Sequence, residues 1–240
     1  MASRAEASAA VPRPHVGAIR AALTDFYFDS LRLVRANLVW GAAVVLVVIL
    51  AIGWPLFGIV SMPLLALPTA GVFRTAARIV RADHDPTKGD LRWAYGRAAG
   101  RLLIVGVGFV ATALVCGWNV GAGLVTGGAP GWLFASLAAW GLVATWCVAL
   151  VLWPILADPQ RPDRPLRDGL RVTVQVLLTQ PRPVAGLAAT VALLVVVSLV
   201  LTVAVLTVSV AFVALIACRS IYPIVDRLDE RDALSVGPTG

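Results

Sequence analysis

The longest charge-free stretch of the chain covers residues 102–157 and reads LLIVGVGFVATALVCGWNVGAGLVTGGAPGWLFASLAAWGLVATWCVALVLWPILA. Its 56 residues greatly exceed the roughly 20 helical residues that cross a hydrocarbon core about 30 Å thick. The segment Thr126-Gly-Gly-Ala-Pro-Gly131 in its middle carries the Gly and Pro residues that break helices. The stretch therefore predicts a hairpin of two membrane spans, near 102–124 and 132–156.

The composition of the whole chain agrees with a membrane protein. Hydrophobic residues make up 59% of the 240 residues and charged residues only 14%, whereas soluble domains contain about 45–50% and about 25%. A soluble domain of this length cannot bury so much apolar surface in one core. We therefore expect an all-α, polytopic helical membrane protein.

The net charge of +7 is confined to four blocks of sequence, residues 4–35, 74–101, 158–182 and 219–232. A nucleic-acid-binding protein gathers its basic residues on polar, foldable surface, so no nucleic-acid partner is predicted. Short loops rich in Arg and Lys stay on the cytoplasmic side of a membrane. The pattern predicts that both termini and the loops 76–101 and 157–183 are cytoplasmic.

Two further stretches, 36–73 and 183–218, carry no charge. An even number of spans must separate cytoplasmic blocks, so each stretch is predicted to form a hairpin. The outer turns fall at Gly53–Gly58 and near Leu201–Val203, the second from length alone, because one helix of 36 residues would be about 54 Å long. Six spans are predicted, near 38–54, 57–75, 102–124, 132–156, 184–201 and 204–222. Five spans are the alternative.

The segments outside the spans contain two predicted amphipathic cytoplasmic helices. One is a juxtamembrane helix over 16–36, and the other covers 165–180, where apolar residues recur every three or four positions. Both adjoin a span, so each can lie at the lipid interface or dock a cytoplasmic partner. Residues 1–15 are predicted to be a disordered tail, and 226–240 a C-terminal tail. The apolar face of the helix predicted over 165–180, which is the candidate partner-docking face, consists of Leu166, Leu170, Val174 and Leu177.

Polar side chains give little sign of chemistry within the membrane. Ionisable residues within spans usually mark ion or proton paths, and the three charge-free stretches contain none. Asn119 is the exceptional polar residue, since an amide in lipid needs a partner; we expect an interhelical hydrogen bond, with a substrate contact as the alternative. The three cysteines and two histidines show no metal-ligand spacing. No catalytic residue, metal, cofactor or enzyme activity is predicted.

Two pairs of glycines have the spacing that lets membrane helices approach closely. They are Gly117-x-x-x-Gly121 and Gly123-x-x-x-Gly127. Packing within the chain is the favoured interpretation, and a homo-oligomer contact is the alternative.

Four places in the sequence resemble the YesL-like family of bacterial multi-pass membrane proteins of unknown function. They are Asn37-Leu-Val-Trp40, Pro68-Thr-Ala-Gly-Val-Phe-Arg74, Asp85 to Arg101, and Trp153-Pro-Ile-Leu-Ala157 followed by Leu166-Arg-Asp-Gly-Leu170 and Gln180-Pro181. The chain departs from the family in a longer apolar run between Trp40 and Pro68 and in having no proline that breaks its last apolar stretch. The resemblance implies a bacterial cytoplasmic (inner) membrane protein with an accessory role beside a carbohydrate uptake system of the ATP-binding cassette (ABC) type.

A permease-like transport subunit is the alternative function. Importer permeases dock on their ATPase through a cytoplasmic loop with the pattern E-A-A-x-x-x-G, which Asp163-Arg-Pro-Leu-Arg-Asp-Gly169 faintly resembles. Arg164 and Pro165 replace both alanines of that pattern. In this alternative, loop 163–181 couples the chain to a cytoplasmic ATPase. A membrane enzyme would need a polar catalytic pair near a span, and the sequence offers none.

Overall fold

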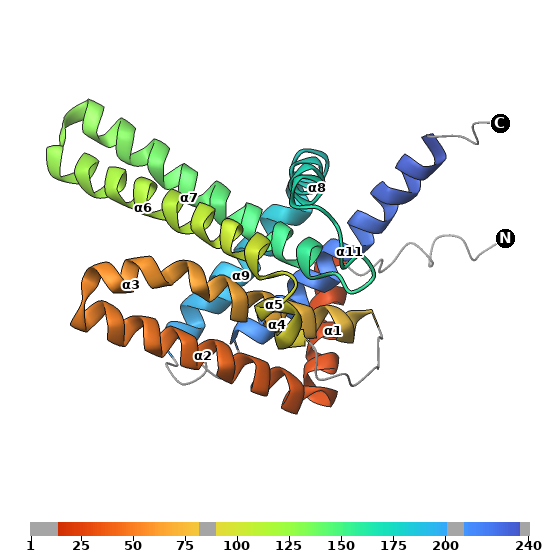
Figure 1. Cartoon of the computed structure of the whole chain (residues 1–240). Coiled ribbons are helices and arrows are strands. Elements are labelled where there is room, and N and C mark those ends of the chain that lie inside the picture. The colour runs from red at the N-terminus through yellow and green to blue at the C-terminus, as the bar shows by residue number, and fades with distance from the viewer. Residues whose placement is uncertain (1–13, 82–89, 201–208, 236–240) are drawn as a thin grey trace.

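The computed structural model describes residues 14–81, 90–200 and 209–235, and within these ranges every regular element is a helix. The helices are connected as Figure 1 shows. They are α1 (Pro14–Phe28), α2 (Ser30–Gly53), α3 (Pro55–Ser61), the 3₁₀-helix η2 (Met62–Leu65), α4 (Ala66–Val80), α5 (Asp90–Tyr95), α6 (Ala99–Thr126), α7 (Gly128–Ala157), α8 (Leu166–Thr179), α9 (Pro181–Val200) and α11 (Val210–Ser235). The predicted all-α class is confirmed for this part of the chain.

The first hairpin pairs α2 with the continuous run α3–η2–α4. The chain turns at Trp54, whose backbone is extended, and Pro55 opens α3, where its fixed φ suits the first helical turn. Gly58 lies so close to α2 that a methyl group there would overlap Ala51. The predicted hairpin over 36–73 and its turn within Gly53–Gly58 are therefore confirmed.

The second hairpin pairs α6 with α7, as the stretch 102–157 predicts. Its turn is formed by Gly127 and Gly128, whose φ angles are 66° and 67°. This left-handed conformation is one that only glycine adopts without strain. Just before the turn, Gly123 faces the backbone carbonyl of Gly131, so the two helices approach closely there.

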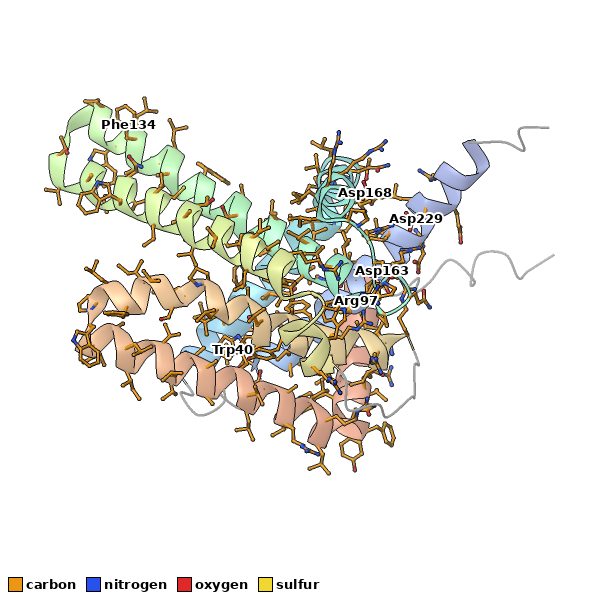
Figure 2. All side chains as sticks on the ribbon, viewed as in Figure 1. Trp40, Arg97, Phe134, Asp163, Asp168 and Asp229 are labelled. Atoms are coloured by element: carbon orange, nitrogen blue, oxygen red, sulfur yellow. The ribbon has the colours of Figure 1, made fainter. Side chains whose placement is uncertain are left out.

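Both hairpins extend to the same side of the molecule, as Figure 1 shows, and we call their turn ends the tips. The opposite end, where α4, α7 and α11 meet, we call the base. In Figure 2, Phe134 lies at a tip, whereas Arg97, Asp163 and Asp229 lie at the other end of the molecule. The charge segregation expected from the sequence is therefore present in space.

The core of the protein sits at the base. The last turns of α7, residues 150–157, are entirely buried, as is most of α4. The ring of Trp153 stacks on Phe73 with a centroid distance of 6.3 Å, and α11 adds Leu215 and Ile221. Toward the tips the helices bury fewer residues: the buried residues of α6 are Leu102, Val105 and Gly106, near its start, and Gly123.

Four segments are long and apolar enough to cross a membrane, namely α2, Pro55–Val80, α6 and α7. The bent pair α8–α9, with 99° between its helices, gives a fifth if it counts as one span. The structure thus supports a membrane-embedded helical protein with four to five such segments, and six spans stay a prediction. The predicted turn near Leu201–Val203 lies outside the described residues, as do residues 1–13 and 236–240.

Two predicted boundaries differ from the structure. The helix predicted over 16–36 is divided at Asp29 into α1 and the first turns of α2. The predicted C-terminal tail from 226 onward continues α11 as far as Ser235. Helix α1 packs on α11, with Phe26 and Phe212 edge to face at 6.0 Å, so it is held by tertiary contacts as well as by its sequence.

Candidate functional site

Arginines and aspartates from distant parts of the sequence converge at the base of the molecule. They come from the end of α4, from the loop between α7 and α8, and from α11. We call this cluster the polar junction. Its members are Arg81, Asp158, Arg161, Arg164, Asp226 and Asp229.

Arg81 is the centre of the polar junction, because it binds two carboxylates at once. Its Nη2 donates to Oδ2 of Asp158 at 2.9 Å, and its Nη1 donates to Oδ2 of Asp226 at 2.7 Å. The guanidinium lies 4.2 Å from the ring centroid of Tyr222, a cation–π arrangement. Burial alone would lower the pKa of Arg81, but hydrogen bonds and charges from Asp226 and Asp158 raise it. Arg81 therefore stays charged.

The loop after α7 is fixed to α11 by two further arginines. Nη2 of Arg161 lies 2.5 Å from Asp229, and Nη2 of Arg164 lies 3.2 Å from both oxygens of the same carboxylate. Asp158 also accepts a hydrogen bond from the backbone N–H of Gln160 at 3.0 Å. The carboxylate thus shapes the loop locally while it binds Arg81.

A second group of arginines binds backbone carbonyls. Buried Arg74 donates from Nη1 to the carbonyls of Ala157 and Asp158 at 3.1 and 2.9 Å, at the C-terminal end of α7, where helix carbonyls lack partners. Arg101 donates to the carbonyls of Pro162 and Arg164. Both guanidiniums lie over the ring of Trp93, at 4.7 and 5.4 Å. The first and second hairpins are thereby joined.

The ion pairs of the polar junction hold α4, the loop after α7 and α11 together. Each carboxylate of the polar junction binds at least one guanidinium. Within residues 14–81, 90–200 and 209–235, no group of three His, Cys, Asp or Glu side chains is placed to hold a metal ion. Buried ion pairs of this kind fix which segments meet, and they are strongly destabilising to break.

Asn119, the polar residue that the sequence selects, lies on an exposed side of α6. Its Nδ2 donates to the carbonyl of Val115 at 2.7 Å, one turn earlier in the same helix. The structure thus shows an intrahelical bond where the sequence predicts an interhelical one. Among the residues that the structure describes, no atom lies within 4 Å of a Cβ placed at Gly117 or Gly121. Of the two small-residue pairs, only Gly123 approaches another helix.

The apolar face predicted for 165–180 is divided in the structure. Helix α8 packs through Gly169, Thr173 and Val176, which are buried. The four predicted residues flank that face: Leu166 and Leu177 are half-buried, whereas Leu170 and Val174 are 42% and 52% exposed. The pattern of large apolar residues does not predict the packing side of α8, because that side contains Gly169, which lets α8 lie directly against Leu156 of α7.

The polar junction itself is a site that the sequence did not predict. One signal was available: Asp158, Asp226 and Asp229 are acids that lie among arginines in the blocks 158–182 and 219–232. Comparisons of the chain with protein-family models, with curated proteins and with solved structures give no match.

Proposed function

We propose that this chain is an integral protein of the bacterial cytoplasmic membrane that serves as a non-catalytic accessory component. The observation that carries the proposal is the division of the molecule into exposed apolar tips and a charged, braced base. Exposed apolar helices of this length need a bilayer around them. The basic excess at the base favours a cytoplasmic location for both termini and for the loops 76–101 and 157–183.

An accessory role is favoured over transport by the distribution of ionisable groups. Carriers of ions and protons place such groups along a path through the membrane. Here the charged side chains gather at the base, where Arg81, Asp158 and Asp226 neutralise one another. We call the charge-free parts of the two hairpins the arms. A base held together by ion pairs and arms without charged side chains suit a protein that associates with a transporter. The link to an ABC-type carbohydrate uptake system rests on the resemblance to the YesL-like family.

Helix α8 is the element through which the alternative function would act. Its exposed side combines Leu170 and Val174 with Arg167 and Arg171, which follow one another at three- and four-residue spacing. Apolar and basic side chains on one face are typical of helices that lie in the headgroup region of a membrane. The bend of 99° between α8 and α9 also suits a surface helix beside a span. The same exposed face, with Leu170 at its centre, is the one that would dock on an ATPase in the permease alternative.

The membrane orientation is tested by labelling introduced cysteines with an impermeant maleimide in intact cells. The starting chain carries alanine at Cys116, Cys147 and Cys218. Ala129→Cys, at an exposed tip position beside the turn residue Gly128, should be labelled from outside. Gln160→Cys, exposed at the base, should be labelled only after the cells are opened. Labelling of Gln160→Cys in intact cells would overturn the orientation.

The accessory role is tested by purification in gentle detergent followed by mass spectrometry. Recovery of subunits of a carbohydrate uptake system supports the proposal, and recovery of no transport subunit overturns it. Leu170→Glu then separates the two functions, with Thr179→Glu, exposed near the end of the same helix, as the matched control. We expect both variants to keep the partner and the uptake. Loss of both in Leu170→Glu alone would establish the permease-like coupling.

A further inference from the structure

A pocket of about 300 Å³ lies between α1, α9 and α11. Its polar lining includes Gln180 at the start of α9 and three arginines of α11, namely Arg219, Arg227 and Arg231. Its apolar lining includes Leu187 and Ile224. None of the polar-junction residues lines it, so this pocket is a separate feature of the same end of the molecule.

Helix α11 sorts its charges onto different sides. Asp226 and Asp229 bind the arginines of the polar junction. Arg227 and Arg231 are one turn apart and line the pocket instead. Neither has an acidic partner among the residues whose placement the structure gives. The pocket therefore presents two uncompensated guanidinium groups.

The remaining charges around the pocket leave it basic. Arg219 is neutralised by Asp25 of α1, with Nη2 to Oδ2 at 2.6 Å, and this pair holds α1 against α11. Glu230 is exposed and is not part of the lining. The N-terminus of α9 also lies at the pocket, through Gln180 and Pro183, and a helix N-terminus carries partial positive charge.

The pocket lies at the boundary between charged and charge-free sequence. Arg219 is the first charged residue after the stretch 183–218, and Leu187 extends the lining into that stretch. In a membrane this boundary is the level of the lipid headgroups. Basic pockets between helices at the cytoplasmic surface recognise anionic lipid headgroups. A basic rim above an apolar wall thus fits an amphiphile that carries a phosphate.

We propose that this pocket binds the phosphate-bearing head of an anionic phospholipid. Arg227 and Arg231 hold the phosphate, and an acyl chain lies along Pro183 and Ile224, which line the pocket and are partly exposed. The inference rests on the proposed placement of the charged base at a membrane surface. Lipid binding in detergent does not depend on which side of the membrane the base occupies, so failure here is distinguishable from a wrong orientation.

The experiment is a titration of the full-length protein in mild detergent, followed by native mass spectrometry. The probe is phosphatidylglycerol; phosphatidylcholine and glycerol 1-phosphate test the need for net negative charge and for the acyl chains. We expect the binding affinity to fall in the order phosphatidylglycerol, phosphatidylcholine, glycerol 1-phosphate. The double variant R227Q/R231Q should weaken phosphatidylglycerol binding by about tenfold or more, since charge-assisted hydrogen bonds to the phosphate are lost.

The matched control is R35Q/R92Q, which removes two exposed arginines that do not line the pocket. Its phosphatidylglycerol affinity should be unchanged. The variant R227K/R231K keeps both charges and should bind more tightly than R227Q/R231Q. Three results overturn the proposal: equal affinity in R227Q/R231Q and the unchanged chain, equally weak binding by both double variants at Arg227 and Arg231, or binding of glycerol 1-phosphate as tight as that of the lipid, which would identify a soluble phosphate ligand.

Discussion

The base and the tips of the two hairpins are made by the same helices but are stabilised in opposite ways. Helix α7 contains both regions. Residues 150–157 are all buried by other parts of the protein, whereas Trp132 and Phe134 near the tip are each 61% exposed. The base combines an apolar core with desolvated ion pairs; the tips offer apolar surface to their surroundings and little else.

This difference indicates where a membrane protein needs its own contacts. A bilayer can cover apolar side chains at the tips, but it cannot pair an arginine such as Arg81, which is buried between helices. The polar junction supplies those partners from α11 and from the loop after α7. Substitutions should therefore cost most at the base and least on the outer faces of the arms.

The largest effect is expected from Asp158→Ala. The side chains of Arg81 and Asp158 are 12% and 3% exposed, so removal of the carboxylate leaves a buried guanidinium short of a partner. Loss of one member of a buried ion pair costs about 3–5 kcal/mol of unfolding free energy. Thermal unfolding of the detergent-solubilised protein should show this as a large drop in melting temperature.

Asp163→Ala is the matched control at the same end of the molecule. Asp163 pairs with Arg97 at 3.0 Å, but the two side chains are 68% and 78% exposed. Exposed pairs contribute about 0–1 kcal/mol, so the melting temperature should barely move. Equal losses in the two variants would show that burial at the polar junction is not what makes it strong.

A smaller effect is expected within the arms, from Gly123→Val. A Cβ at Gly123 would lie 2.5 Å from the carbonyl oxygen of Gly131, so the helices must separate. Overpacking of this kind costs about 1–3 kcal/mol, measurable by the same thermal unfolding. Gly117→Val is the control, because the space at Gly117 is open. If Gly117→Val were equally damaging, that face would have to be covered by something other than the residues that the structure describes.

The next effect concerns Asn37, a fully buried residue of α2. Its Oδ1 accepts a hydrogen bond from the backbone N–H of Ala211 at 3.1 Å, in the first turn of α11. Asn37→Leu leaves that N–H without this acceptor, at a cost of about 1–3 kcal/mol, partly offset because leucine has a similar size and is apolar. No change in melting temperature for Asn37→Leu would contradict a capping role.

Both hairpins of the first 157 residues could be predicted from sequence because each depends on local signals. Charge-free length sets the spans, and Gly127, Gly128 and Pro55 set the turns. The polar junction could not be predicted, because Arg81, Asp158 and Asp226 are joined only by tertiary packing. The packing side of α8 was hidden for a related reason: Gly169 and Thr173 carry no hydrophobic signal, yet their small size allows the contact.

The two asparagines show the same limit and give the smallest predicted effect. Sequence position marks Asn119 as exceptional because it lies in the middle of an apolar stretch, whereas Asn37, at the edge of one, is the residue that reaches another helix. Asn119→Leu removes only a bond to the carbonyl of Val115, which keeps its place in the α6 ladder. An exposed substitution of this kind should change stability by about 0.5 kcal/mol or less. Melting of Asn119→Leu should be compared in detergent and in lipid nanodiscs. A drop in melting temperature confined to the nanodiscs would mean that a second copy of the chain covers Asn119 in a bilayer. The outer faces of the arms would then form protein contacts and not only lipid contacts.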